Sequence, residues 1–295
     1  MTTNSAYKIC GQLIDYAVAL HHSQFRVFSF GGVLFGEKGR LLRWDRSGVV
    51  YTEAFQWKTQ PDTLCEFFWR LNFLLTVDRG YDTTVTPVMD DDDEAKAALL
   101  KLKTYGGWGK GEKIEIANVY RFLVHNDRAV DGQLKSYIIP GAIWDTSALF
   151  GRCTFGYIAY DVARSKLVYL KDFWRTNLPR TRKLSNAEVP NIPALGPAGD
   201  VPLSADHAST FPFAVQRTET QDYVKESGRR GDWCSSRPCV EPYVRYQLVL
   251  ETLGQPLNTF ESTRQKRGLE MSSRSKEKWL VRYGEQFHTA KVGLT

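Results

Sequence analysis

Long apolar runs are absent from this sequence. No stretch approaches the roughly eighteen consecutive apolar residues that a membrane-spanning helix needs. The first residues, MTTNSAYKIC, also lack the basic region followed by an apolar run that marks a secretory signal. We therefore expect an intracellular protein, cytoplasmic or nuclear, with no membrane partner.

Cysteine is scarce and irregularly spaced. The five cysteines are Cys10, Cys65, Cys153, Cys234 and Cys239. Their odd number and wide separation favour reduced thiols over a disulfide framework. Only Cys234 and Cys239 are close, and no His or Cys pair completes a zinc spacing around them. The sequence thus predicts no metal site.

Excess positive charge is confined to one end of the chain. The net charge is +6, but the residues from Arg264 onward hold eight Lys or Arg against three Glu. The rest of the chain is therefore close to neutral. A basic tail of this kind is more often solvated than a nucleic-acid surface, and we expect no nucleic-acid partner.

The chain does contain enough apolar residues for a folded protein. Hydrophobic residues make up 42% of its 295 positions, which suits two modest domains and excludes a disordered chain. Helical spacing predicts a helix over residues 5–20, and Pro61 and Asp62 open a second one. Between them lie three strand-like runs with turn residues between, at 24–36, 40–46 and 49–57. We expect a three-stranded antiparallel meander covered by the second helix.

Further strands are expected in the second half of the chain. They lie at 147–150, 156–161, 166–174 and 244–254, with a turn at residues 163–165. The Pro- and Gly-rich stretch 189–204 is expected to be irregular.

Five consecutive acidic residues, Asp90 to Glu94, precede a helical pattern. They could bind a divalent cation, but a helix N-terminus itself favours negative charge. The calcium-loop spacing with its glycine and final glutamate is missing, so the helix interpretation is preferred.

The stretch GRCTFGYIAYD, residues 151–161, resembles part of a phosphate-binding loop. Gly151 and Gly156 match the ends of a G-x-G-x-x-G pattern, but Cys153 occupies the middle. Alone, the pattern suits a hairpin turn better. Lys171 changes this balance because it ends an apolar strand fifteen residues after Gly156, where it could reach nucleotide phosphates. The alternative interpretation is that Lys171 is a solvent-exposed lysine on an edge strand.

Several segments together resemble the fungal-type protein kinase family, a divergent branch of the protein-kinase-like fold. They are RVFSFGGVLF, RLLRWDRSGVVYTEAF, FFWRLNF, DRGYDTTV, GRCTFGYIAYD, LVYLKDFWR, VPNIP and VRYQLVLETLGQPLNTFESTRQ. The resemblance covers about residues 6–265, and the Arg-Trp-Asp-Arg-Ser-Gly block is its most specific part.

This resemblance implies an α+β fold. A helix-flanked antiparallel meander domain (1–137) would be followed by an antiparallel sheet of the kinase first-lobe type (138–265) and a divergent basic tail (266–295). It implies an ATP-dependent Ser/Thr or related phosphotransferase. The implied ATP-binding residues are Gly151, Arg152, Thr154, Gly156, Ile158, Lys171 and Glu251.

The catalytic half of such a site is missing. Phosphoryl transfer needs an Asp and an Asn from H-R-D-x-x-x-x-N and a magnesium-binding D-F-G, and the sequence has neither. Glu188 is the only candidate partner for the lysine, and Pro190 disfavours a helix there. Tyr169 places a ring where a small residue usually lies over the adenine. We expect a chain truncated before its second lobe, without catalytic residues, in which ATP binding is weak or absent and magnesium is not bound.

The sequence leaves three hypotheses for the function. The first is a kinase-derived chain without phosphoryl transfer that acts by binding a protein partner, such as a full-length relative. The second is a complete kinase in which the Asp90 cluster supplies magnesium ligands. The third is an interaction module on the meander domain that binds no nucleotide.

Overall fold

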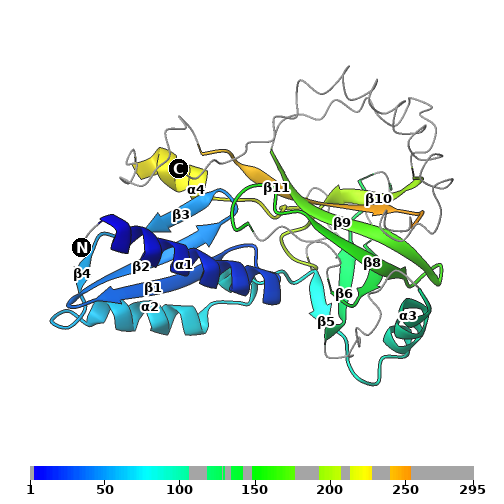
Figure 1. The fold of residues 1–295 in the computed structure, drawn as a ribbon, viewed down its shortest axis with the longest axis horizontal. Helices are drawn as coiled ribbons and strands as arrows, with labels where there is room; N and C mark the ends of the chain where they lie inside the picture. Colours follow the sequence, from blue (N-terminus) through cyan, green and yellow to red (C-terminus); the bar gives the residue numbers. More distant parts are fainter. Residues whose placement is uncertain are drawn as a thin grey trace, which may run out of the picture. The chain divides into compact units, whose positions relative to one another are not determined.

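The structure is a computed structural model, in which the described residues form two antiparallel sheets and four α-helices (Figure 1). It describes residues 3–105, 118–127, 129, 134–141, 148–176, 193–206, 213–227 and 240–253. All of these except Pro193 belong to one compact unit. The basic tail, Glu188 and the cysteines at 234 and 239 lie outside the described residues.

The first sheet is the predicted meander. Its strands are β1 (Ser29–Phe35), β2 (Lys38–Asp45), β3 (Gly48–Tyr51) and β4 (Phe55–Gln56). They follow the order β1-β2-β3, and the short β4 pairs with the start of β2. Alternation along β2 sends Trp44 to one face of the sheet and Arg43 to the other, and their partners on β1 are Ser29 and Phe30.

A helix packs on each face of this sheet. Helix α1 (Thr3–Ser23) buries Ala17 against Trp44 and Leu149. Helix α2 (Asp62–Phe73) lies on the other face, where the ring of Phe67 meets that of Phe30 with centroids 6.2 Å apart. The expected cover of the meander is confirmed. No residue of α2 is fully buried, however, and its Phe68, Trp69 and Phe73 are exposed.

The second sheet has seven strands in the order β10-β11-β9-β8-β7-β6-β5, and every neighbouring pair is antiparallel. In chain order the strands are β5 (Val85–Pro87), β6 (Tyr120–Val124), β7 (Lys135–Ile139), β8 (Phe155–Asp161), β9 (Lys166–Thr176), β10 (Leu195–Asp200) and β11 (Tyr243–Leu250). The strand with Lys171, β9, lies between the strand with Gly156 and the last strand. The predicted α+β class with antiparallel sheets is confirmed.

Two apolar clusters lie on opposite faces of the second sheet. One contains Phe122, Tyr157, Val168 and Leu170, which are at most 3% exposed. The other lies under α3 (Asp93–Thr104) and contains residues from the helix, from β7 and β8, and from the position just before β6. Its buried members are Ala95, Ala98, Leu102, Val119, Ile138, Ile158 and Tyr160.

Three local expectations were wrong. Residues 148–150 form no strand, and the strand before the glycine segment is β7. Part of the stretch expected to be irregular forms β10, where the edge position and a register shift after Leu195 accommodate Pro197, which has no amide to donate. Helix α4 (Thr220–Ser227) was missed altogether.

The domain boundary after residue 137 stays a prediction. Strand β7 spans it, and the second sheet contains strands from both sides of it. Among the described residues, no helix is long and apolar enough to cross a membrane.

Candidate functional site

The glycine segment leads into β8 rather than forming a hairpin tip. Gly156 lies within β8, directly opposite Lys171 on β9, and Ile158 lies opposite Tyr169. The tip of the β8–β9 hairpin is at the far end, where Asp161 pairs with Lys166. The structure therefore brings Gly156, Ile158 and Lys171 together on one face of the sheet.

The start of the glycine segment is held by hydrogen bonds to its own chain. The amide of Gly151 donates to the carbonyl oxygen of Arg46 (2.8 Å), and the carbonyl oxygen of Arg152 accepts from the amide of Trp174 (2.8 Å). The Arg46 guanidinium donates to the carbonyl oxygen of Leu149 (3.1 Å). Gly151 has a φ of 89°, a left-handed conformation that glycine adopts without strain. Because its amide is already used, Gly151 does not present this N–H to a ligand.

Lys171 lies on the face of β9 opposite to the buried Leu170 and Asp172. Its ammonium nitrogen is 5.3 Å from the centroid of the Phe173 ring, and the Arg152 guanidinium is 5.7 Å from the same ring. Within the described part of the chain, neither cation has a carboxylate within ion-pair distance. Burial lowers the pKa of Lys171, and the positive charge of Arg152 lowers it further. Two neighbouring, uncompensated cations attract an anion.

Tyr169 occupies the space above Gly156. A Cβ atom added to Gly156 would overlap the hydroxyl group of Tyr169, so glycine is needed for this close approach. Burial raises the pKa of the Tyr169 hydroxyl. The ring therefore fills part of the face that the glycine and lysine share, as the sequence suggested it could.

Glu251 and Thr154 do not join this group through any contact that the structure gives. The Glu251 carboxylate pairs with Arg164 and with Lys166 (3.2 Å), at the hairpin end of β8 and β9. Hydrogen bonds from these two cations lower the pKa of Glu251. Its amide donates to the carbonyl oxygen of Ala194 (2.8 Å). The carboxylate and the backbone amide of Glu251 thus both have partners in the chain itself.

A buried polar network on the opposite face was not anticipated. Arg245 donates to both carboxylate oxygens of Asp172 (3.0 and 3.1 Å from Nε), to Asp82 (2.5 Å) and to the amide oxygen of Gln216 (3.0 Å). All four residues are at most 5% exposed. Burial alone would lower the pKa of Arg245, but the charges of Asp172 and Asp82 raise it. The sequence did contain a signal for this network, because Asp172 and Arg245 are charged residues at inward-facing positions of two predicted strands.

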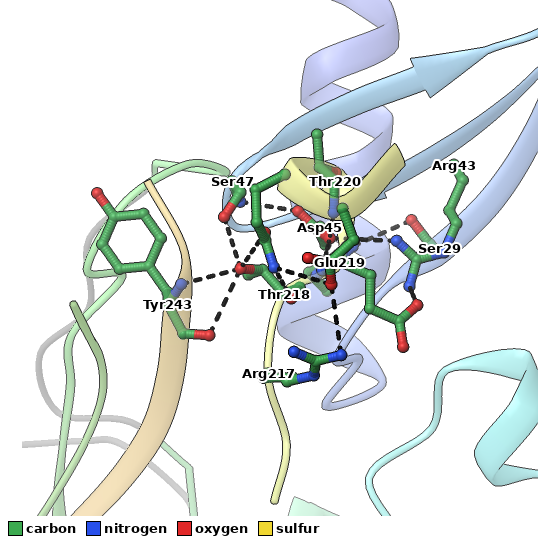
Figure 2. Close-up of polar contacts among 12 residues, drawn as sticks. Ser29, Arg43, Asp45, Ser47, Arg217, Thr218, Glu219, Thr220 and Tyr243 are labelled. Atoms are coloured by element: carbon green, nitrogen blue, oxygen red, sulfur yellow. Dashed lines mark hydrogen bonds and ion pairs between the residues drawn. The ribbon is translucent and has the colours of Figure 1, made fainter. Parts of the chain in front are cut away.

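The Arg-Trp-Asp-Arg-Ser-Gly block joins the two sheets (Figure 2). Asp45 Oδ2 accepts from the amides of Glu219 (2.8 Å) and Thr220 (2.9 Å), which caps the N-terminus of α4. Ser47 Oγ donates a hydrogen bond to Thr218 Oγ1 (2.6 Å). It also lies 2.6 Å from the carbonyl oxygen of Glu241. Thr218 Oγ1 accepts from the amide of Tyr243 at the start of β11 (2.9 Å). Among the described residues, the contacts of this block connect the first sheet to α4 and to β11.

The acidic cluster has the role of a helix cap. Asp92 Oδ1 accepts from the amide of Ala95 (3.0 Å) at the start of α3. Arg121 pairs with Asp92 (2.7 Å) and Glu94 (2.6 Å). Among the described residues, no group of three or more His, Cys, Asp or Glu side chains could hold a metal ion.

Comparison with known proteins identifies one family. A sequence model described as fungal protein kinase matches residues 2–266. No curated protein and no solved structure matches the chain.

Proposed function

Because the chain belongs to the fungal protein kinase family, we propose that it is a protein-kinase-like chain that binds the phosphates of a nucleotide through Lys171 and Arg152 without transferring a phosphoryl group. The observation that carries this proposal is the pair of cations beside Phe173, with no carboxylate paired to either in the described residues. A phosphate between them would relieve their mutual repulsion and accept hydrogen bonds from both.

The fit to a nucleotide is partial. The cations suit phosphate oxygens, whereas the Tyr169 hydroxyl over Gly156 limits the room beside them for a base. The Gly151 amide is bonded to Arg46 and adds nothing to a phosphate cradle. We therefore expect weak binding that depends more on the phosphates than on the base.

Absence of transfer is proposed from the sequence. These 295 residues contain no H-R-D and no D-F-G, and Asp172-Phe173 is followed by Trp174. Asp172 is buried and paired with Arg245, so its carboxylate is committed to the sheet. When ATP and magnesium are bound, a kinase site supplies charge neutralisation and an in-line phosphoryl acceptor; Lys171 and Arg152 contribute only the neutralisation.

The test uses three ligands with the full chain: ATP, tripolyphosphate and adenosine. ATP and tripolyphosphate should raise the melting temperature of the parent protein, and adenosine should not. Lys171→Ala should abolish both responses. Lys166→Ala is the matched control, since Lys166 is on the same strand but paired with Glu251. An equal response to ATP in the parent and Lys171→Ala would overturn the lysine assignment.

Phosphoryl transfer is measured separately. Pure protein incubated with radiolabelled ATP, magnesium and a general protein substrate should incorporate no label. Incorporation that disappears in Lys171→Ala would overturn the proposed inactivity.

A second candidate function is an interaction module that binds no nucleotide and contacts a protein partner, such as a full-length relative. The exposed apolar residues of α2 favour it. If neither ATP nor tripolyphosphate changes the melting temperature of the parent, this candidate replaces the first.

A further inference from the structure

A cavity of 380 Å³ lies beside the first sheet, away from β9 and the glycine segment. It is formed by the end of α1, by β1, by α2 and by the short helix η1 (Val77–Arg79) with the residues after it. Its lining residues are Leu20, Arg26, Ser29, Phe30, Phe68, Leu71, Asn72, Arg79 and Tyr81. This volume is within the range of small-molecule sites, about 300–1,000 Å³.

One side of the cavity carries two arginines without ion pairs. Arg26 donates to the amide oxygen of Gln24 (2.9 and 2.7 Å) and to the carbonyl oxygen of Arg79 (2.6 Å), which are all neutral acceptors. Its guanidinium lies 3.6 Å from the centroid of the Tyr81 ring. No carboxylate in the described residues is within ion-pair distance of either arginine. Two positive charges therefore share this wall.

The guanidinium of Arg79 has fewer partners than that of Arg26. Its guanidinium donates no hydrogen bond to any described residue, and its Nε is buried without a partner. Buried N–H groups are nearly always bonded, and this one has no acceptor among the described residues. The N–H groups of guanidinium form a planar fork that matches the two oxygens of a carboxylate. Burial lowers the pKa of neighbouring Arg26, and the positive charge of Arg79 lowers it further.

The lining of the cavity also includes apolar side chains. Leu20, Phe30 and Leu71 are partly buried, and Phe68 is 57% exposed. A ligand that fills the cavity would thus place an anionic group against the arginines and an apolar body against these side chains.

We propose that this cavity binds a small organic anion with an apolar body, of which a medium-chain carboxylate is the simplest example. The proposal goes beyond the nucleotide site, because it shares no residue with Lys171, Arg152 or the glycine segment.

Octanoate is the probe, measured by isothermal titration calorimetry on the full chain. It should bind with a stoichiometry of one. Acetate lacks the apolar body and octanol lacks the charge, so each should bind at least tenfold more weakly. Within a series of carboxylates, affinity should rise roughly fourfold for each added methylene until the cavity is full.

Two variants locate the site. Arg79→Gln should weaken octanoate binding at least tenfold and leave octanol binding unchanged. Its control is Arg70→Gln on α2, because Arg70 is exposed and paired with Glu66. Phe68→Glu places a negative charge in the cavity lining and should also weaken octanoate binding. Its control is Trp69→Glu, on the same helix but outside the cavity lining.

The proposal fails if octanoate does not bind, or if it binds the Arg79→Gln and parent proteins equally. If Arg79→Gln does not fold, the comparison of Phe68→Glu with Trp69→Glu decides, since both positions are exposed. Equal octanoate affinity in that pair also overturns the proposal.

Discussion

Asp172 on β9 and Arg245 on β11 form a buried ion pair across two neighbouring strands, on the sheet face opposite to Lys171. Arg245 also reaches Asp82, so one guanidinium pairs with two buried carboxylates. Removal of Arg245 would leave both carboxylates charged and without their shared partner away from water.

We therefore predict that Arg245→Ala destabilises the protein by about 3–5 kcal/mol, the usual cost of leaving a buried charge without its partner. The free energy of unfolding is measured by urea denaturation. Glu66→Ala is the control, because Glu66 pairs with Arg70 in an exposed position, where about 0–1 kcal/mol is expected. Equal losses in the two variants would show that the Arg245 network does not stabilise the sheet.

Asp45 should matter for α4 although 174 residues separate it from Glu219. Asp45→Ala removes the acceptor of two helix amides and a bond to Arg43, and we expect a loss of about 2 kcal/mol. The comparison is Asp93→Ala, whose side chain is 96% exposed at the start of α3. If urea denaturation gives the same small change for both, the cap contributes little.

Gly156 and Tyr169 should be coupled in a double-mutant cycle. Gly156→Ala should destabilise the parent by about 1–3 kcal/mol through overlap with the tyrosine. In a Tyr169→Ala background the same change should have a much smaller effect, because the ring that it meets is gone. Additive losses would indicate that the ring moves away freely.

The same cycle bears on nucleotide binding. Tyr169→Ala should strengthen binding of ATP, with less effect on tripolyphosphate, because the freed space adjoins the base rather than the cations. Calorimetric titration of both ligands provides the measurement. A loss of ATP affinity in Tyr169→Ala would mean that the ring contacts the nucleotide.

His21 should make stability depend on pH. Burial, assisted by the positive charge of Arg46, lowers the pKa of His21 to about 2. In the unfolded chain the pKa is about 6.5, so the unfolded state binds the extra proton as the pH falls below that value. The native state then loses about 1.4 kcal/mol per pH unit between pH 6.5 and its own pKa. Above pH 6.5 the contribution is complete.

Unfolding of the parent and His21→Gln at pH 7, 6 and 5 tests this. The parent should lose more stability over this range than the variant, which has no imidazole at position 21. His288, in the basic tail, supplies a control substitution to Gln that should keep the parent's pH dependence. Parallel curves for all three proteins would exclude His21 as the titrating group.

Much of the fold could be predicted because local patterns and tertiary structure agree. The meander has alternating apolar residues and clear turns, and α2 begins at the proline and aspartate that predicted it. Strand β10 could not be predicted, because Pro197 reads as a strand breaker unless its edge position is known. Helix α4 was missed because its cap, Asp45, comes from a distant part of the sequence.

The site was predicted in part for a similar reason. Strand alternation correctly placed Lys171 and Tyr169 on one face, and pairing brought Gly156 opposite the lysine. The engagement of Glu251 with Arg164 and Lys166, and of Gly151 with Arg46, depends on contacts across the chain that no local pattern encodes.

Arg46 holds Gly151 by its main chain and Leu149 by its side chain, although it belongs to the turn of the meander. The segment that leads into β8 is thus held in place by a turn 103 positions upstream of Leu149. Folding of the meander turn therefore has to be complete before the start of the glycine segment can take its final shape.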